Sequence, residues 1–270
     1  DTPISEGGIV GAGVGAALMG KRPIVDIMFL EYLSLVLQQL GCDAGSMHYY
    51  SDGRARVPLV VRAKFGVGPY HGHAYDYHAW VAHLPGIKVA MPSNASDAKG
   101  MMKAAIQDDN PVLFLEHRGL YHGAREEIPQ GDVVVPLGEA KLVREGRDAT
   151  VVAIGAMVRR AQLAAEALAK EGIEIDIIDL RCIVPLDKAR ILASVAKTGR
   201  LVVVSESMKF CGSGAEIAAL VAEEGFRFLK APIERVATPN VPIPFARNLE
   251  KMIIPDEIAV AAAVRRTMAG

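Results

Sequence analysis

The sequence is poor in cysteine and has no long block of charge of one sign. Its three cysteines, Cys42, Cys182 and Cys211, match no metal-binding or redox spacing. A reducing, cytosolic or matrix-like setting is therefore expected. The 30 basic and 31 acidic residues give a formal net charge of −1, which argues against binding to nucleic acid or to an anionic membrane. The longest apolar stretches have the length of β-strands and are too short to span a bilayer.

Several familiar catalytic motifs are also missing. The sequence contains no Walker A, HExxH or GxSxG pattern. The glycines Gly11, Gly13 and Gly15 resemble part of a dinucleotide-binding fingerprint, but such a fingerprint follows a strand, and no strand is predicted before them. These small residues are better explained by close packing of a helix. We therefore predict no self-contained metal or nucleophile site.

What the sequence does contain is a large apolar fraction in alternating patterns. Hydrophobic residues make up 51% of the 270 residues and charged residues 23%, which is enough for a sizeable core. In the first half, β-branched runs predict strands at residues 23–29, 57–62, 87–91 and 112–116, and longer periodic runs predict helices at 32–40 and 98–107. This alternation indicates parallel βαβ units.

A second alternating block follows a less regular segment. Residues 117–136 mix charges, Gly and Pro without periodicity. Beyond them, strands are predicted at residues 149–155, 175–180 and 201–205, and helices at 158–170, 187–197 and 212–224. We therefore predict an α/β protein of two domains, residues 1–128 and 137–270, joined by a linker at residues 129–136.

An acid stands at the start of a helix rich in glycine and alanine. After Glu6, no polar side chain occurs before Lys21. A carboxyl group in apolar surroundings favours its neutral form, which raises its pKa, and it can then exchange a proton with a nitrogen heterocycle near neutral pH. Alternatively, Glu6 only complements the positive end of the helix dipole. The pattern alone leaves both interpretations open.

Three histidines and an acid lie together in the segment 71–80. His71 and His73 are two residues apart and His78 follows five residues later, which matches no familiar zinc spacing. One of these histidines could instead donate a proton in a loop site, since the pKa of histidine lies near neutrality. Ordinary solvated loop histidines are the alternative.

Short blocks spread along the chain carry a family resemblance. They include Asp1-Thr2-Pro3-Ile4-Ser5-Glu6, Arg22-Pro23-Ile24-Val25, His83-Leu84-Pro85-Gly86-Ile87-Lys88-Val89, Asp179-Leu180-Arg181, Val184-Pro185-Leu186-Asp187 and Pro242-Ile243-Pro244-Phe245. On these blocks the chain resembles the β subunit of thiamine-diphosphate-dependent 2-oxoacid dehydrogenases, the family of the pyruvate, branched-chain and acetoin dehydrogenases. The resemblance covers essentially all residues. Family members carry a further segment before the Asp-Thr-Pro block, which would supply an opening helix and strand.

The resemblance implies a fold, a cofactor and partners. The expected fold is a transketolase-like pyrimidine-binding domain with a parallel sheet, followed by a transketolase C-terminal α/β domain. In an α2β2 heterotetramer, the α subunit would hold Mg²⁺ and the diphosphate of thiamine diphosphate through a Gly-Asp-Gly motif. The nearest match here, Ser51-Asp52-Gly53, lies in a different setting. This chain is thus expected to hold half of the cofactor and no metal, in the bacterial cytoplasm or the mitochondrial matrix.

The resemblance also implies roles for individual residues. In the family, the glutamate that matches Glu6 hydrogen-bonds the aminopyrimidine ring of the cofactor, which makes Glu6 catalytic as well as cofactor-binding. The residues that match Ile4, Met28 and Tyr32 contact the same ring, and Tyr32 replaces a usual phenylalanine. His73 matches the active-site histidine, which is thought to orient the substrate or the lipoyl group and to move protons.

The histidine loop departs from the family pattern. Family members usually read His-Gly, two further residues, then His-Ser-Gln, whereas this chain reads His71-Gly72-His73-Ala74-Tyr75. The loop should therefore be shorter, and the substrate side of the pocket more aromatic. His71 and His73 both remain candidates for the working histidine, and we favour His73. The identity of the 2-oxoacid stays open.

We therefore expect the β subunit of a 2-oxoacid dehydrogenase that acts on a small 2-oxoacid, or on an acetoin-like ketone, and passes an acyl group to the lipoyl domain of a partner acyltransferase. One alternative is a divergent two-subunit thiamine enzyme that does not use lipoamide, such as a split transketolase, which the altered histidine loop favours. Another is a non-catalytic assembly subunit, against which the presence of Glu6 argues.

Overall fold

The chain divides into two compact units. The computed structural model describes residues 1–68, 72–123 and 125–269. The first unit comprises Asp1–Leu137 together with Cys182–Pro185, and the second comprises Gly138–Arg181 and Leu186–Gly270. The first unit thus includes residues 129–136 of the expected linker. The return of residues 182–185 to the first unit was not predicted from the sequence patterns.

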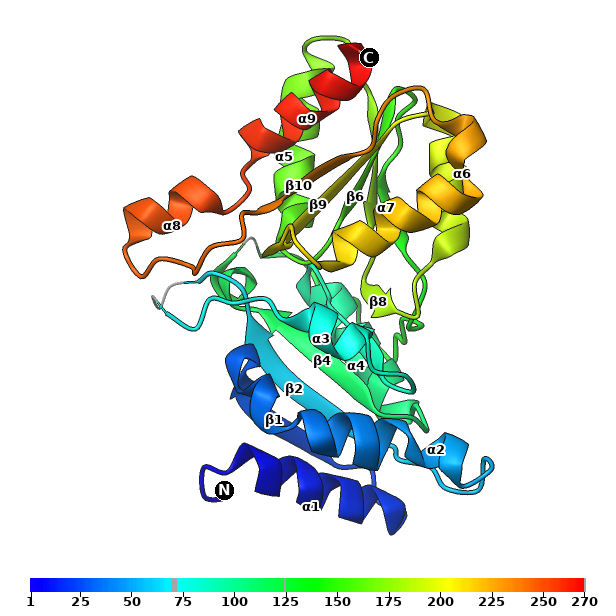
Figure 1. Cartoon of the computed structure of the whole chain (residues 1–270), viewed down its shortest axis with the longest axis vertical. Coiled ribbons are helices and arrows are strands. Elements are labelled where there is room, and N and C mark those ends of the chain that lie inside the picture. Colours follow the sequence, from blue (N-terminus) through cyan, green and yellow to red (C-terminus); the bar gives the residue numbers. More distant parts are fainter. Residues whose placement is uncertain (69–71, 124, 270) are drawn as a thin grey trace. The chain divides into compact units, whose positions relative to one another are not determined.

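The first unit is built on a five-stranded sheet in the order β1-β2-β4-β3-β8 (Figure 1). Its strands are β1 (Ile24–Phe29), β2 (Val60–Phe65), β3 (Lys88–Ala90), β4 (Val112–His117) and β8 (Cys182–Val184). The first four pair in parallel, and β8 runs antiparallel to β3. Because β1, β2 and β4 are parallel neighbours, their carboxyl ends meet at one edge of the sheet.

Helices connect these strands. They are α1 (Glu6–Leu18), α2 (Met47–Tyr50), α3 (His78–Ala82) and α4 (Ala95–Gln107), with short turns η1 (Leu30–Leu35), η2 (Gln39–Gly45) and η3 (Arg118–His122). The predicted helix at residues 32–40 is helical in the structure but is not one regular helix: a 3₁₀ helix occupies residues 30–35, and a π-helix begins at Gln39. The reason lies in the apolar spacing. Leu30, Leu33 and Val36 are fully buried, and a spacing of three matches the three-residue turn of a 3₁₀ helix.

The second unit has its own five-stranded sheet in the order β10-β9-β6-β7-β5. The strands are β5 (Lys141–Arg144), β6 (Ala149–Ala153), β7 (Ile175–Asp179), β9 (Leu201–Met208) and β10 (Glu234–Thr238), and only β5 is antiparallel to its neighbour. Every residue of β6 and β7 is buried. Consecutive side chains of a strand point to opposite faces, so both faces of the sheet are covered.

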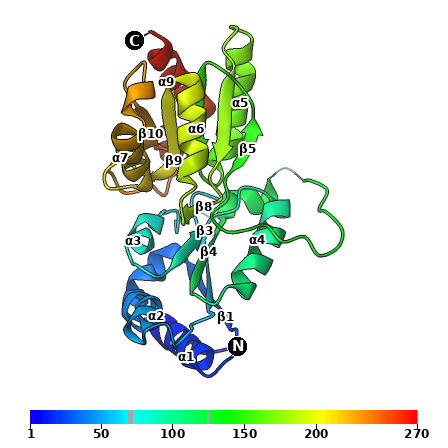
Figure 2. The ribbon, with the colours of Figure 1, turned by 90° about the vertical axis from the view of Figure 1, so that its right-hand side faces the viewer.

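The described part of the second unit has six helical segments. They are α5 (Met157–Ala169), α6 (Lys188–Thr198), α7 (Ser213–Glu224), η4 (Phe226–Phe228), α8 (Arg247–Ile253) and α9 (Glu257–Ala269). Of these, α5, α6, α7 and α9 lie around the sheet (Figure 2). Helices α5 and α9 pack against each other, as do α6 and α7. The predicted α/β fold with two domains of strands and helices is confirmed. Within the described residues, no helix is long and apolar enough to cross a membrane.

Candidate functional site

His73 packs against aromatic side chains at the carboxyl end of β1. Its ring stacks on Phe29, with centroids 4.3 Å apart and planes 8° from parallel. Tyr32, in η1, meets the His73 ring edge-on at a centroid distance of 5.8 Å. Tyr32 and His73, two of the predicted site residues, are therefore brought together by the fold, and the Phe29 ring contacts both.

Arg118 holds the backbone beside His73. It follows β4 directly, is 4% exposed, and donates hydrogen bonds from Nη1 to the carbonyls of Gly72, at 2.7 Å, and of His73. Its guanidinium carbon also lies 5.5 Å from the centroid of the Phe29 ring, a cation–π geometry. His73 has a φ of +49°, a conformation that disfavours residues other than glycine. The two hydrogen bonds from Arg118 stabilise this conformation.

Glu31 supplies a carboxylate next to the imidazole. Its Oε1 lies 4.0 Å from Nδ1 of His73 and accepts a hydrogen bond from the backbone nitrogen of Tyr75 at 3.3 Å. Its Oε2 is buried, and no described residue hydrogen-bonds it. A buried acceptor with no protein partner is uncommon in folded proteins and can mark a ligand site.

Aromatic residues continue along the histidine loop. Tyr75 stacks on Tyr77 at 5.1 Å, and Tyr77 stacks on Trp80 at 4.5 Å. Burial, followed by the charges of Tyr75 and Glu31, raises the pKa of Tyr77, so its hydroxyl stays protonated and can donate a hydrogen bond.

Met28 occupies an irregular position in β1. The pairing of β1 with β2 shifts between Asp26 and Phe29, and Met28 has a φ of +63°. Its backbone nitrogen donates to Oδ1 of Asp26 at 2.7 Å. This hydrogen bond satisfies the Met28 N–H group, which the bulge removes from the pairing of β1 with β2. The Met28 side chain is left 48% exposed. Such strained conformations concentrate at functional sites.

Glu6 begins α1, and Ile4 precedes the helix. Ile4 is 93% exposed, and Glu6 is half-buried. Helix α1 contacts β1 and η1, and a Cβ atom on Gly7 would lie 3.3 Å from the carbonyl of Leu35, so the start of the helix lies close to η1. In the described part of the chain, no hydrogen bond or ion pair joins Glu6 to Met28, Tyr32 or His73.

The sequence interpretation missed three members of this cluster. Phe29 ends a predicted strand but was not assigned to the site, Glu31 is two residues further on, and Arg118 lies in a segment interpreted as part of an irregular connection. The position of Arg118 directly after a buried strand was a usable signal, because ligand sites of α/β sheets lie at the carboxyl ends of strands. His71, the other candidate histidine, lies outside the described residues.

These residues can receive an aromatic heterocycle. Ile4 and Met28 expose apolar surface, Tyr32 offers an aromatic ring, and the carboxylate of Glu6 has no hydrogen-bond partner among the described residues. Exposed apolar side chains and a carboxylate without a protein partner are groups that a nitrogen-containing ring can contact. Across the described residues, no group of three or more His, Cys, Asp or Glu side chains is arranged to hold a metal ion.

Comparison with known proteins places the chain in a family. Residues 1–123 match the transketolase pyrimidine-binding domain, and residues 138–260 match the transketolase C-terminal domain. A structure described as a split-gene transketolase, inactive β4 tetramer, superposes with a TM-score of 0.82 over 100% of this chain and 83% of that chain, at 23% identity. That likeness supports the fold.

Relatives of higher identity are dehydrogenase subunits. The chain is 44% identical to the β subunit of acetoin:2,6-dichlorophenolindophenol oxidoreductase of Cupriavidus necator, over 100% of this chain and 80% of the relative. It is 44% identical to the mitochondrial pyruvate dehydrogenase E1 component subunit beta-2 of Oryza sativa subsp. japonica, over 98% and 72%. It is 41% identical to the 2-oxoisovalerate dehydrogenase subunit beta of Bacillus subtilis, over 97% and 81%. The chain therefore belongs to the transketolase-like family of 2-oxoacid dehydrogenase β subunits.

Proposed function

We propose that this chain combines with an α subunit to form the active site of a thiamine-diphosphate-dependent 2-oxoacid dehydrogenase. The observation that carries the proposal is the convergence of Tyr32 and His73 at the carboxyl end of β1, beside the strained Met28. It occurs in a chain up to 44% identical to such β subunits. Ligands of α/β sheets bind at this edge.

The residues present fit the aminopyrimidine half of thiamine diphosphate. Glu6 would hydrogen-bond a ring nitrogen and exchange a proton with it, while Ile4 and Met28 would contact the ring and Tyr32 would stack near it. When bound, the cofactor supplies the nucleophilic carbon and the electron sink that decarboxylation requires. The protein contributes the orientation of the ring and the protonation state of its nitrogen.

His73 is proposed to act on the substrate side. Its ring is oriented by Phe29 and its backbone by Arg118, while Oε1 of Glu31 lies 4.0 Å from Nδ1. Such a histidine can hydrogen-bond the carboxylate or oxo group of a small 2-oxoacid, and it can deliver a proton during acyl transfer.

Partners and location are part of the proposal. The α subunit would bring Mg²⁺ and the diphosphate contacts within an α2β2 assembly, and a lipoyl acyltransferase would accept the acyl group. The names of the relatives, which are subunits of dehydrogenases, support a partner subunit. The location that we propose for such an enzyme is the bacterial cytoplasm or the mitochondrial matrix.

A second candidate is a two-subunit thiamine enzyme that does not use lipoamide. The stacking of Tyr75 on Tyr77 favours it, because Tyr75 belongs to the loop that departs from the family pattern. An assay that omits the acyltransferase separates the two candidates: turnover with an artificial electron acceptor but no transfer to a lipoyl domain would favour the second.

The test is co-production with an α subunit, followed by an assay of decarboxylation over a panel of 2-oxoacids and acetoin. Glu6→Gln should lower kcat by a factor of about 10² to 10⁴, the range of general acid–base catalysis. Glu223→Gln, on an exposed position of α7, is the matched control and should keep full activity. An intact complex whose turnover is unaffected by Glu6→Gln would refute the proposed role, and a complex with no turnover on any substrate would favour an assembly subunit.

A further inference from the structure

A cavity lined by arginines lies at the opposite edge of the first sheet. It has a volume of about 320 Å³ and is lined by Ala17, Leu18, Gly20, Arg22, Arg54, Ala55, Arg56, Pro58 and Asp109. Arg22 precedes β1, Pro58 precedes β2 and Asp109 precedes β4. The cavity therefore faces the amino ends of the strands, whereas His73 and Tyr32 lie at their carboxyl ends.

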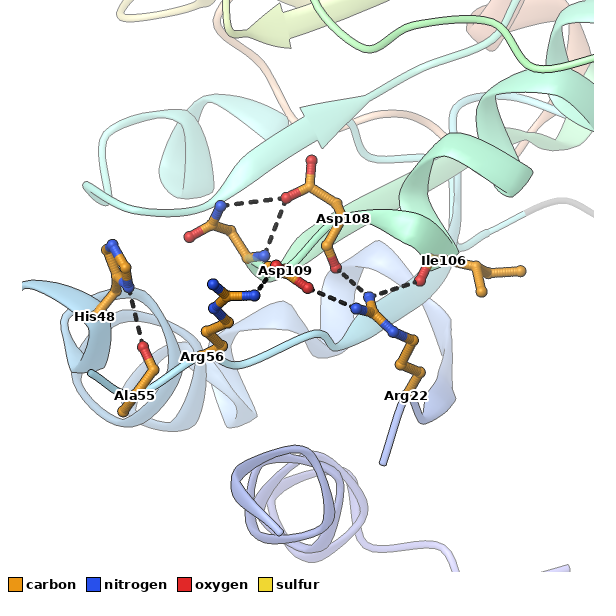
Figure 3. Close-up of polar contacts among 8 residues, drawn as sticks. Arg22, His48, Ala55, Arg56, Ile106, Asp108 and Asp109 are labelled. Carbon is orange, nitrogen blue, oxygen red and sulfur yellow. Dashed lines mark hydrogen bonds and ion pairs between the residues drawn. The ribbon is translucent and has the colours of Figure 1, made fainter. Parts of the chain in front are cut away.

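Positive charge is in excess in this cavity. Asp109 is the one acid among its lining residues, against three arginines. Both oxygens of Asp109 are engaged: Oδ1 accepts from Nη2 of Arg22 at 2.5 Å, and Oδ2 accepts from Nη1 of Arg56 at 2.6 Å (Figure 3). The hydrogen bond from Arg22, with the charge of Arg56, lowers the pKa of Asp109. Asp109 thus stays ionised and leaves two positive charges unbalanced.

The three arginines differ in how many of their N–H donors are free to bind a ligand. Both Nη groups of Arg22 already donate hydrogen bonds within the chain, because Nη1 also donates to the carbonyls of Ile106, at 3.1 Å, and Asp108, at 2.9 Å. Arg54 donates only from Nε, to the carbonyl of Ser51 at 2.9 Å, and Arg56 only from Nη1. Among hydrogen bonds within the described residues, the Nη groups of Arg54 and the Nε and Nη2 groups of Arg56 take no part.

The segment that carries Arg54 and Arg56 is held in place. Nδ1 of His48 donates to the carbonyl of Ala55 at 2.9 Å, as Figure 3 shows, and the backbone nitrogen of Ala55 donates to Oγ of Ser51 at 2.8 Å. The carboxyl end of α1 carries partial negative charge, but its carbonyls at Ala16 and Ala17 already accept from Lys21 and Gly20. These hydrogen bonds to Ala55 hold the backbone between Arg54 and Arg56 in a fixed turn.

We propose that this cavity binds a small phosphate-bearing molecule, with Arg54 and Arg56 as its principal ligands. Guanidinium groups match phosphate oxygens in a bidentate geometry, and a phosphate monoester carries up to two negative charges, which would balance the excess. The volume lies at the lower end of the range for small-molecule sites, and Ala17, Leu18 and Pro58 provide apolar surface for the organic part. Binding here does not depend on the proposed dehydrogenase function.

The test uses the full chain and glycerol 3-phosphate in isothermal titration calorimetry, with glycerol and inorganic phosphate for comparison. Glycerol 3-phosphate should bind in one-to-one ratio, glycerol should not bind, and inorganic phosphate should bind more weakly. Arg54→Gln and Arg56→Gln should each weaken binding about tenfold, because each removes charge-assisted hydrogen bonds. Arg125→Gln, an exposed arginine of the same unit, is the matched control and should bind like the wild type.

Two outcomes would overturn the proposal. Equal weakening by Arg125→Gln would show a general charge effect. Absence of glycerol 3-phosphate binding to the wild type would also overturn it, and loss of α-subunit assembly in Arg54→Gln and Arg56→Gln would then assign the arginines to a protein partner. Unchanged circular dichroism spectra of the variants verify that each still folds.

Discussion

Glu31 in the first unit and Asp176 in the second both carry carboxylates shielded from solvent, with side chains 17% and 1% exposed. Asp176 is completely bonded: Oδ1 accepts from the backbone of Gly146, at 2.7 Å, and from Nζ of Lys197, at 2.8 Å, and Oδ2 accepts from Oγ of Ser194 at 2.6 Å. Glu31 leaves Oε2 without a described partner.

The difference separates a structural carboxylate from one available to a ligand. A buried acceptor that is fully bonded rigidifies its surroundings, and one that is not lowers stability unless something else binds it. Function commonly lowers stability in this way. The unbonded oxygen belongs to a residue whose other oxygen lies 4.0 Å from Nδ1 of His73, where a polar substrate would be expected. The following variants are ordered by their expected effect on the free energy of unfolding.

Asp176→Ala should have the largest effect. Removal of this carboxylate leaves the donors of Gly146, Ser194 and Lys197 without their acceptor, which we expect to lower the free energy of unfolding by about 3 kcal/mol. Hydrogen exchange of the amides of β6 and β7 reports on the second unit alone. Glu223→Ala, on the surface of α7, should change stability by less than about 0.5 kcal/mol. Equal protection in both variants would contradict the structural role of Asp176.

Arg118→Gln should have the next largest effect. The loss of two charge-assisted hydrogen bonds, to Gly72 and His73, is expected to cost about 2 kcal/mol and to release the His73 ring from Phe29. With the α subunit present, kcat should fall about tenfold, with Arg118→Lys in between because lysine keeps the charge but not the planar fork. A normal kcat in Arg118→Gln would show that His73 needs no such support.

Acid should remove a smaller contribution from Glu116. Burial raises the pKa of Glu116, but the hydrogen bonds from Arg62, at 2.6 Å, and from Tyr121, with the charges of Arg62 and Lys64, outweigh burial and hold this pKa below its usual 4.5. A depressed folded-state pKa stabilises the protein above the unfolded-state value, and that stabilisation disappears as the pH falls through the folded-state value. Because Arg62 is 36% exposed, solvent screens the pair and the effect should not exceed about 1 kcal/mol.

The measurement is urea denaturation from pH 7 down to pH about 3, the range in which carboxylates titrate, for the wild type and Glu116→Gln. The variant should lose less stability below pH 4.5 than the wild type does. Parallel curves would mean that Glu116 titrates alike in the folded and unfolded states.

Glu31→Gln should have the smallest effect on stability. Its Oε2 has no described partner, so removal of the charge should change the free energy of unfolding by no more than about 0.5 kcal/mol. Activity in the complex should nevertheless fall, because His73 loses the neighbouring carboxylate, whose Oε1 lies 4.0 Å from Nδ1. A large loss of stability would instead place Glu31 in the same structural class as Asp176.

Local patterns predicted much of the fold. The strands at residues 112–116, 149–155 and 175–180 were recognised because buried parallel strands are short, β-branched apolar runs. The helices at residues 98–107 and 158–170 were recognised because an apolar stripe must recur at helical spacing. The expectation of a two-domain α/β fold rested on these patterns, and the resemblance added its transketolase-like type and the proposed roles of Glu6 and His73.

The sequence by itself thus determined the class of the fold, the family and the elements that carry Glu6 and Met28, since each depends on neighbours along the chain. Only the tertiary structure decided that β8 joins the first sheet and that Arg22 and Arg56 share Asp109. It also decided that Arg118 supports Gly72 and His73, which lie 46 and 45 positions earlier in the chain. The physical reason is that such contacts depend on which strand ends meet at a sheet edge, and periodicity along the chain carries no information about that meeting.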